Sequence, residues 1–325
     1  MTDSLQGSYM RPVLGDTIEA IETETATATE TATATATAIA AASARLRDVL
    51  ALAKPRLSML VLCTTGVGLW LAPGELSIWR SLIIMAATAL VVGAANALNS
   101  YIERDIDGLM QRTASRPLPA QRLEPRVALY LGLALAALST AVLIASANVL
   151  TAALSVIAFI TYVCIYTPLK QRSALAVIVG AVPGAIPPLM GWTAVTNRVD
   201  AGGLALFALL FAWQIPHFLA IATYLRDDYA RASLRVLPVT QGERATKTWM
   251  LVSVVALLPV SLLPAYTGIA GATYAWVATL FGFGFLAASL YGVWADNVER
   301  WARRVFLGSL VYLTVLLVIL MMRAS

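Results

Sequence analysis

One polar cluster follows directly on the hydrophobic run SLIIMAATALVVGAA and interrupts an otherwise apolar sequence. In the segment NSYIERDID, the oxygen-bearing side chains of Asn99, Glu103 and Asp107 recur at every fourth position. If the preceding helix continues through this segment, these side chains share one helical face and Asp105 lies off it. Mg²⁺ typically takes one or two carboxylates from a protein and completes its shell with water and substrate phosphates. The spacing therefore predicts a magnesium site.

Arginines follow this row at once, in the segment MQRTASRPLP. The guanidinium groups of Arg112 and Arg116 match phosphate oxygens in a bidentate way that a lysine cannot reproduce. Carboxylates for a cation and arginines for phosphate together predict a diphosphate ligand. The alternative is a solvated helix end whose acids and bases pair for solubility. The helical register and the long apolar lead-in favour the binding site.

A second acidic cluster lies in YLRDDYARASLRVLP, where two aspartates stand among arginines: Asp227 and Asp228 among Arg226, Arg231 and Arg235. A third polar segment, YTPLKQRS, contributes Lys170 and Arg172. For these two residues, the ordinary excess of basic residues in cytoplasmic loops explains the sequence nearly as well as a phosphate contact does.

The elements that must carry these residues are membrane helices. The chain is 59% hydrophobic and 13% charged, and its mean hydropathy is +0.76. Soluble domains average about 45–50% apolar and about 25% charged residues, so we expect an all-α integral membrane protein. A spanning helix needs about 20 mostly apolar residues. Nine such runs are predicted, at about 57–73, 81–102, 127–145, 148–166, 174–195, 203–222, 247–266, 273–294 and 305–322.

The basic residues predict the orientation of these nine spans. With a cytoplasmic N-terminus, 20 of the 23 Lys and Arg residues fall on the cytoplasmic side, as the positive-inside rule requires. Both acidic clusters then lie on that side, because four spans separate them. The chain looks like a loose duplication into two related halves.

Residues 1–44 form a Thr/Ala/Glu-rich tail that precedes the nine-helix domain of residues 45–325. The tail carries six acidic residues against one arginine and has no continuous apolar core, which is typical of neither a transit peptide nor a signal peptide. We expect it to be disordered or a frayed helix. The missing transit peptide favours a bacterial plasma membrane over a mitochondrial one. Cys63 and Cys164 fall inside apolar runs and are expected to be buried small side chains.

Two predicted spans contain features that point to a cavity. The segment VIVGAVPGAIPPLMGW is rich in Gly and Pro, and the backbone groups freed by such breaks are tolerated only inside protein or along a cavity. A simple packing kink is the alternative. The next span holds Gln214 and His217, the only histidine. Intramembrane polar groups are candidates for function, and a histidine beside a cavity could ligate haem iron. A structural role is the alternative.

Five segments together carry a family resemblance: NSYIERDIDGLMQRTASRPLP, YTPLKQRS, GAVPGAIPPLMGW, WQIPHFLAIATYLRDDYARA and VLPV. They resemble the protohaem IX farnesyltransferases, a branch of the UbiA-type intramembrane prenyltransferase superfamily. The superfamily signature Asn-x3-Asp/Glu-x3-Asp is filled by Asn99, Glu103 and Asp107. The central glutamate, the RTxxRPLP sequence and the PHF before the second acidic motif are typical of the haem branch. Arg235 departs from the family pattern, which often has proline there.

The resemblance implies a helical bundle around a lateral, lipid-open cavity, with Mg²⁺ and diphosphate at its cytoplasmic cap. The implied catalytic and metal-binding residues come from both acidic motifs: Asn99, Glu103, Asp107 and Asp228. The implied diphosphate-binding residues are basic: Arg112, Arg116, Lys170 and Arg172. His217 is the expected haem-binding residue.

The reaction implied by the resemblance is transfer of a farnesyl group from farnesyl diphosphate to a vinyl group of haem B, a substrate rather than a cofactor. Water captures the resulting cation, which gives haem O for haem-copper oxidase biogenesis. A haem A synthase and a terminal oxidase are the candidate downstream partners. Two alternatives stay open: a sister prenyltransferase acting on a quinone precursor, and a cation-coupled transporter. The second has weaker support, because its binding residues should lie near the bilayer midplane.

Overall fold

The computed structural model describes residue 30 and residues 33–322, and all regular secondary structure in this part of the chain is helical. Two units are distinguished, Met1–Val49 and Leu50–Ser325. In the first unit, residues 33–49 form a helix with mostly exposed side chains. Most of the tail predicted to be disordered lies outside the described residues, so the extent of its disorder stays a prediction.

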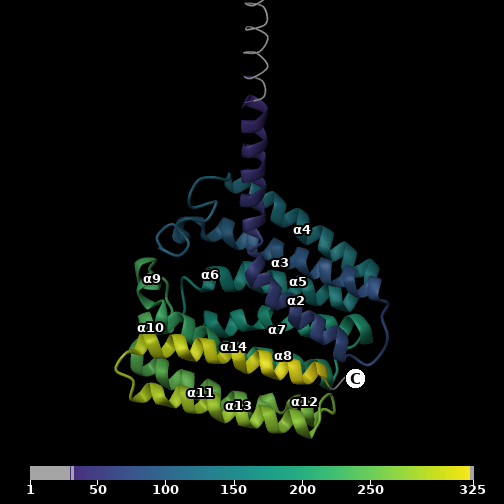
Figure 1. Ribbon diagram of the computed structural model, residues 1–325, viewed down its shortest axis with the longest axis vertical. Coiled ribbons are helices and arrows are strands. Elements are labelled where there is room, and N and C mark those ends of the chain that lie inside the picture. Colours follow the sequence, from purple (N-terminus) through teal and green to yellow (C-terminus); the bar gives the residue numbers. More distant parts are fainter. Residues whose placement is uncertain (1–29, 31–32, 323–325) are drawn as a thin grey trace, which may run out of the picture. The chain divides into compact units, whose positions relative to one another are not determined.

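The second unit is a bundle of long apolar helices (Figure 1). Within the described residues, eight helices are long and apolar enough to cross a membrane, and a ninth, shorter apolar helix covers Ser58–Leu71. This set matches the nine predicted spans and makes the chain a multi-pass membrane protein. Its elements are α2 (Pro55–Leu71), α3 (Ile78–Asp107), α4 (Pro125–Ser146), α5 (Val149–Ile160) with a π-helical turn (Thr161–Tyr166) and α6 (Thr167–Leu169), α7 (Ala176–Thr196), α8 (Ala201–Tyr224), α9 (Arg226–Arg231), α10 (Leu237–Thr240), α11 (Gly242–Ser261), α12 (Leu263–Tyr266), α13 (Ala272–Leu290) with a 3₁₀ turn (Tyr291–Val293), and α14 (Val298–Met322).

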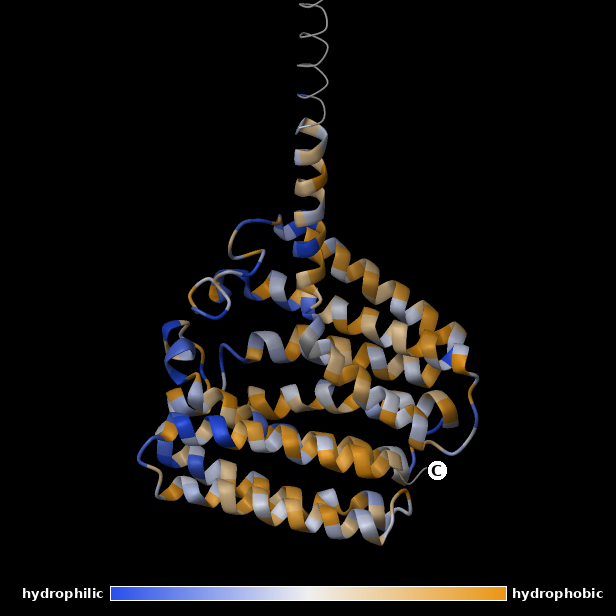
Figure 2. Cartoon of the chain, in the orientation of Figure 1, coloured by the Kyte–Doolittle hydropathy of each residue, from blue (hydrophilic) through white to orange (hydrophobic). Residues whose placement is uncertain are grey.

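Hydrophilic residues gather at one end of the bundle (Figure 2). The loop after α3, the short helix α9 and the first turns of α11 and α14 lie at this end, while the middle of each long helix is hydrophobic. The two acidic segments therefore emerge on the same side, as predicted from the even number of spans between them. The assignment of this side to the cytoplasm, and the duplication into halves, stay predictions.

Helices α2 and α7 approach each other so closely that only glycine fits between them. A Cβ atom on Gly68 would lie 2.0 Å from the backbone oxygen of Pro188, and one on Gly191 would lie 2.1 Å from that of Thr65. Despite its three prolines, α7 is one continuous helix. The sequence-based expectation of breaks in this helix was therefore wrong, because the prolines remove N–H donors without ending the helix.

Three other sequence-based expectations need correction. Cys63 and Cys164 are both free and exposed rather than buried; they lie on spanning helices, so their side chains face the lipid region. Helix α8 ends at Tyr224, so no continuous helix connects His217 with Asp228. The last span begins at Val298 rather than near residue 305, because a charged first turn precedes its apolar part.

Candidate active site

Helix α3 carries the first acidic motif on one buried face. The helix starts at Ser77, whose hydroxyl accepts a hydrogen bond from the Arg80 amide, and it continues without a break to Asp107. The exposed fractions of Asn99, Glu103 and Asp107 are 3%, 3% and 1%, whereas the Asp105 side chain is 83% exposed. The predicted helical register is confirmed: three oxygen-bearing side chains point into the protein, and the fourth points out of it.

Each carboxylate on this face is paired with a base from another segment. Lys170 Nζ donates to Glu103 Oε1 at 2.9 Å and to Oε2 at 3.2 Å. Arg116 Nη1 donates to Asp107 Oδ2 at 2.7 Å. Burial alone would lower the pKa of Lys170, but the adjacent Glu103 carboxylate raises it above its ordinary value. The structure thus brings two predicted phosphate-binding bases into direct contact with two predicted metal ligands.

Lys54 is a further member of this cluster and was not among the residues predicted for the site. Its Nζ donates to Asn99 Oδ1 at 2.7 Å, while Asn99 Nδ2 donates to Thr167 Oγ1 at 3.2 Å. Lys54 adopts a left-handed backbone conformation just before α2, and Asn96 Nδ2 fixes this turn by donating to the carbonyl of Ala53. Burial lowers the pKa of Lys54 to about 7. The only signal in the sequence was a lysine directly before the proline that starts the first span.

The second acidic motif folds against the loop that follows α3. Asp228, buried in α9, accepts hydrogen bonds from the Gln111 amide at 3.1 Å and from the Arg231 guanidinium. Burial would raise the pKa of Asp228, but these hydrogen bonds outweigh it and hold the pKa below its ordinary value. A small apolar cluster of Met110, Ala232 and Leu234 holds the two segments together. The two motifs, far apart in sequence, therefore meet at one end of the bundle.

Two predicted phosphate-binding residues, Arg112 and Arg172, make no direct side-chain contact with the acidic residues in the described part of the chain. Arg112 is exposed and lines an open polar depression of about 750 Å³ that it shares with Asp228 and Arg231. Arg172 is exposed, and its side chain has no hydrogen bond or ion pair within the described part of the chain. Arg112 is therefore close to the second acidic motif, whereas the structure does not bring Arg172 into the cluster.

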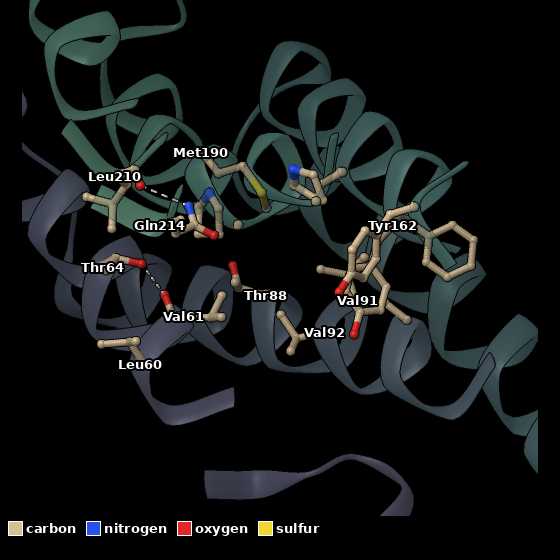
Figure 3. Close-up of a pocket in the computed structure, with 18 of the residues that line it drawn as sticks. Leu60, Val61, Thr64, Thr88, Val91, Val92, Tyr162, Met190, Leu210 and Gln214 are labelled. Atoms are coloured by element: carbon tan, nitrogen blue, oxygen red, sulfur yellow. Dashed lines mark hydrogen bonds between the residues drawn. The ribbon is translucent and has the colours of Figure 1, made fainter. Parts of the chain in front are cut away.

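An apolar cavity of about 310 Å³ lies inside the bundle next to the acidic face. Side chains from α2, α3, α5, the π-helical turn, α7 and α8 line it, and Asn96 places it within one turn of Asn99. Figure 3 shows Gln214 and Met190 on one side of the cavity and Thr88 on the other. The predicted pocket beside the Gly/Pro-rich helix is confirmed by Gly180, Pro183, Gly184 and Pro187 in its wall.

The two predicted polar residues of α8 differ in their environments. Gln214 Nε2 donates to the carbonyls of Leu210 and Ala181, so its amide is used within the helix packing. His217 lines the cavity and is 7% exposed. Its Nδ1 lies 2.7 Å from Ser309 Oγ, and its ring stacks on Trp213 with a centroid distance of 4.5 Å. Among the described residues, Nε2 of His217 has no hydrogen-bond partner.

The π-helical turn is another feature that the sequence did not reveal. It brings Tyr162 and Tyr166 to the cavity wall, and Lys170 follows one turn later. Single π-helical turns inside α-helices frequently occur at functional sites. This span therefore contributes Tyr162 and Tyr166 to the cavity wall and Lys170 to the ion pair with Glu103.

The residues of the two acidic motifs fall inside a match to a known family model. Residues 61–311 match the UbiA prenyltransferase family. The chain belongs to this family. Among its UbiA relatives, a protein named protoheme IX farnesyltransferase from Anaeromyxobacter dehalogenans is 56% identical over 275 residues, which are 85% of this chain and 93% of the relative. A relative of the same name from Myxococcus xanthus is 50% identical over 82% of this chain and 91% of its own length.

Solved structures share the UbiA fold at low sequence identity. A digeranylgeranylglyceryl phosphate synthase is 17% identical, with a TM-score of 0.73 over 86% of this chain and 98% of the other. A UbiA homolog from Archaeoglobus fulgidus bound to GPP and Mg²⁺ is 16% identical, with a TM-score of 0.65 over 85% of this chain and 99% of the other. These likenesses establish the all-helical membrane fold.

Proposed function

We propose that this protein transfers the farnesyl group of farnesyl diphosphate to a vinyl group of haem B, with addition of water, and so produces haem O and diphosphate. The observation that carries the proposal is the buried row Asn99, Glu103 and Asp107 beside an apolar cavity that contains His217. The names of the two bacterial relatives support haem as the acceptor and farnesyl as the group transferred.

The donor set fits Mg²⁺. Asn99, Glu103, Asp107 and Asp228 offer only oxygen atoms, the ligands that this hard cation prefers. Within the described residues, no three His, Cys, Asp or Glu side chains are gathered closely enough to hold a metal ion. Mg²⁺ typically takes one or two carboxylates from a protein and completes its shell with water and substrate phosphates. The UbiA homolog bound to GPP and Mg²⁺ supports the same assignment. Bound Mg²⁺ supplies charge stabilisation for the departing diphosphate.

The basic residues of the site have two sets of acceptors available. Lys170, Arg116 and Arg231 hold the carboxylates of Glu103, Asp107 and Asp228, and Lys54 holds the Asn99 amide. If the carboxylates held a divalent cation, the side chains of Lys54, Arg116, Lys170 and Arg231 would become available to donate to diphosphate oxygens. Arg112 would add a donor from the exposed side, whereas a diphosphate contact by Arg172 stays a prediction. These donors stabilise the negative charge that builds up as the allylic C–O bond breaks.

The cavity would hold the isoprenoid chain and keep water from the developing cation until the acceptor has attacked. Its wall is largely apolar, with Val91, Val92 and Met190 among its residues, and exclusion of water limits side reactions of reactive intermediates. His217 would bind the haem iron and so place a vinyl carbon toward the allylic centre. Water then captures the cation on the acceptor.

We also propose that the hydrophilic end of the bundle faces the cytoplasm of a bacterial plasma membrane, so that farnesyl diphosphate enters from that side. The bias of 20 basic residues among 23 supports this orientation. A haem A synthase or a terminal oxidase in the same membrane would receive the product.

Product analysis by mass spectrometry tests the proposal. Membranes containing the wild type are given haem B, farnesyl diphosphate and Mg²⁺, and a farnesylated haem is expected. Asp107→Asn or EDTA should abolish this product. Asp105→Asn is the matched control, because Asp105 lies on the exposed side of the same helix, and it should leave the yield unchanged. Prenylation of an added quinone precursor instead of haem would overturn the proposed acceptor. No prenylated product at all would overturn the proposed reaction.

A further inference from the structure

Ser309, on helix α14, contacts the only histidine of the chain from outside the cavity wall. Its Oγ lies 2.7 Å from Nδ1 of His217 on α8 and 2.6 Å from the carbonyl oxygen of Phe306. Ser309 is fully buried, with an exposed fraction of 0%. The hydroxyl therefore has two close partners and no access to solvent.

The donors and acceptors available at this contact determine the tautomer of the imidazole. A serine hydroxyl has one proton to donate and two lone pairs that can accept. The Phe306 carbonyl can only accept, so at 2.6 Å the serine proton must point toward it. Ser309 Oγ then accepts from His217, which requires the proton on Nδ1. The opposite tautomer would direct the serine proton to Nδ1 and leave two unprotonated oxygens in close contact.

The surrounding contacts hold both partners in place. Trp213 Nε1 donates to the backbone carbonyl of Ser309 at 2.7 Å, and its indole ring stacks on the imidazole of His217. The ring of Phe306 also contacts the imidazole, with a ring centroid distance of 5.0 Å. These contacts join α8 to α14 and surround the imidazole beside Ser309.

We infer that Ser309 is a positioning residue for haem binding, which fixes His217 as its Nδ1–H tautomer and leaves the Nε2 lone pair free for the haem iron. The inference rests on the proposed function for the identity of the ligand, but the tautomer follows from the contacts of the described residues alone. A ligating histidine usually donates its other ring N–H to a partner that fixes tautomer and ring orientation. Here that partner is a hydroxyl from a helix that contributes nothing to the cavity wall.

The tautomer can be measured directly, because the chain contains one histidine. The full-length protein is purified with a histidine-free affinity tag, labelled with ¹⁵N-histidine and reconstituted into lipid bilayers at neutral pH without haem. Solid-state NMR should then show a protonated Nδ1 and an unprotonated Nε2. A wild-type spectrum with a protonated Nε2 would overturn the inference.

Substitutions at Ser309 test whether its hydroxyl determines the tautomer of His217. Ser309→Ala should move the population toward the Nε2–H tautomer, and Ser309→Thr, which keeps the hydroxyl, should restore the wild-type signals. Ser253→Ala is the matched control: Ser253 is also buried and also donates to a carbonyl three residues earlier in its own helix, but it has no contact with His217. Unchanged signals in Ser309→Ala would contradict the assignment.

Titration with haem B separates this inference from the proposed function. Loss of such a partner typically weakens metal binding by about 10–100-fold. Ser309→Ala should therefore bind haem about 10–100-fold more weakly than Ser309→Thr. His217→Ala should remove the absorption bands of histidine-ligated haem. If the wild type and His217→Ala give the same haem spectrum, the iron-binding part of the proposed function is wrong, while the NMR result still decides the tautomer.

Discussion

Replacing Lys170 with methionine would leave the buried carboxylate of Glu103 without its cation. The side chains of Lys170 and Glu103 are 17% and 5% exposed, so solvent screens this pair little. Breaking a buried ion pair from one side typically costs about 3–5 kcal/mol. We therefore expect Lys170→Met to lose about 3–5 kcal/mol of stability at pH 7.

The pH dependence of this loss follows from Lys170. The Glu103 carboxylate raises the pKa of Lys170 above its ordinary value. The stabilising contribution of Lys170 is therefore complete below the unfolded pKa of about 10.4 and is lost as pH rises through the folded pKa. The difference in stability between the wild type and Lys170→Met should therefore be the same at pH 7 and pH 9.

The assay is reversible unfolding by SDS in mixed micelles, followed by circular dichroism at pH 7 and pH 9. The double variant Glu103→Gln, Lys170→Met removes both charges and should recover most of the stability without recovering product formation. Lys247→Met is the matched control, because its partner Glu243 is 46% exposed, and exposed ion pairs contribute about 0–1 kcal/mol. A loss for Lys170→Met that equals the control, or that differs between pH 7 and pH 9, would refute the argument.

Two further predictions concern packing and the cavity. Gly191→Ala should destabilise the fold by about 1–3 kcal/mol, because its Cβ would meet the backbone oxygen of Thr65 at 2.1 Å; Gly284→Ala, with nothing within 4 Å of its Cβ, should be neutral or gain up to about 1 kcal/mol of helix propensity. Equal unfolding midpoints for the two variants would contradict the close contact of α2 and α7. Val92→Phe should fill part of the 310 Å³ cavity and raise the KM for farnesyl diphosphate more than that for geranyl diphosphate, whereas Val92→Ala should not. Steady-state kinetics with both diphosphates would show this, and parallel changes in the two KM values would place the isoprenoid elsewhere.

The parts of the site that the sequence predicted are those encoded by local periodicity. Asn99, Glu103 and Asp107 could be placed on one face because their spacing matches the helical repeat. The apolar run before them indicates that a membrane helix continues into this segment. Hydropathy alone located the nine apolar helices, because a span needs a fixed length of apolar residues.

The rest depends on which neighbour each residue meets, and hydropathy does not encode this. Lipid is as apolar as a helix interface, so Cys63 and Cys164 have the same pattern whether they face lipid or protein, and the buried assignment was wrong. For the same reason, the sequence did not show that Lys54 contacts Asn99 from a turn 45 positions earlier. It also did not show the role of Ser309, which lies in an apolar run. The contact between Asp228 and the Gln111 amide joins positions 117 apart, and no local pattern could predict it.

Helix α3 is longer than the membrane requires. Its 30 residues span about 45 Å at 1.5 Å per residue, against a hydrocarbon thickness of about 30 Å. Asn99, Glu103 and Asp107 occupy the surplus at one end, so the bond that breaks in the proposed reaction lies at the boundary between two solvents. The two products then separate by solubility: diphosphate dissolves in water, and the prenylated macrocycle, which gains a fifteen-carbon chain, stays in the bilayer. This partitioning opposes the reverse reaction, and it leaves the product in the same membrane as the enzyme proposed to use it.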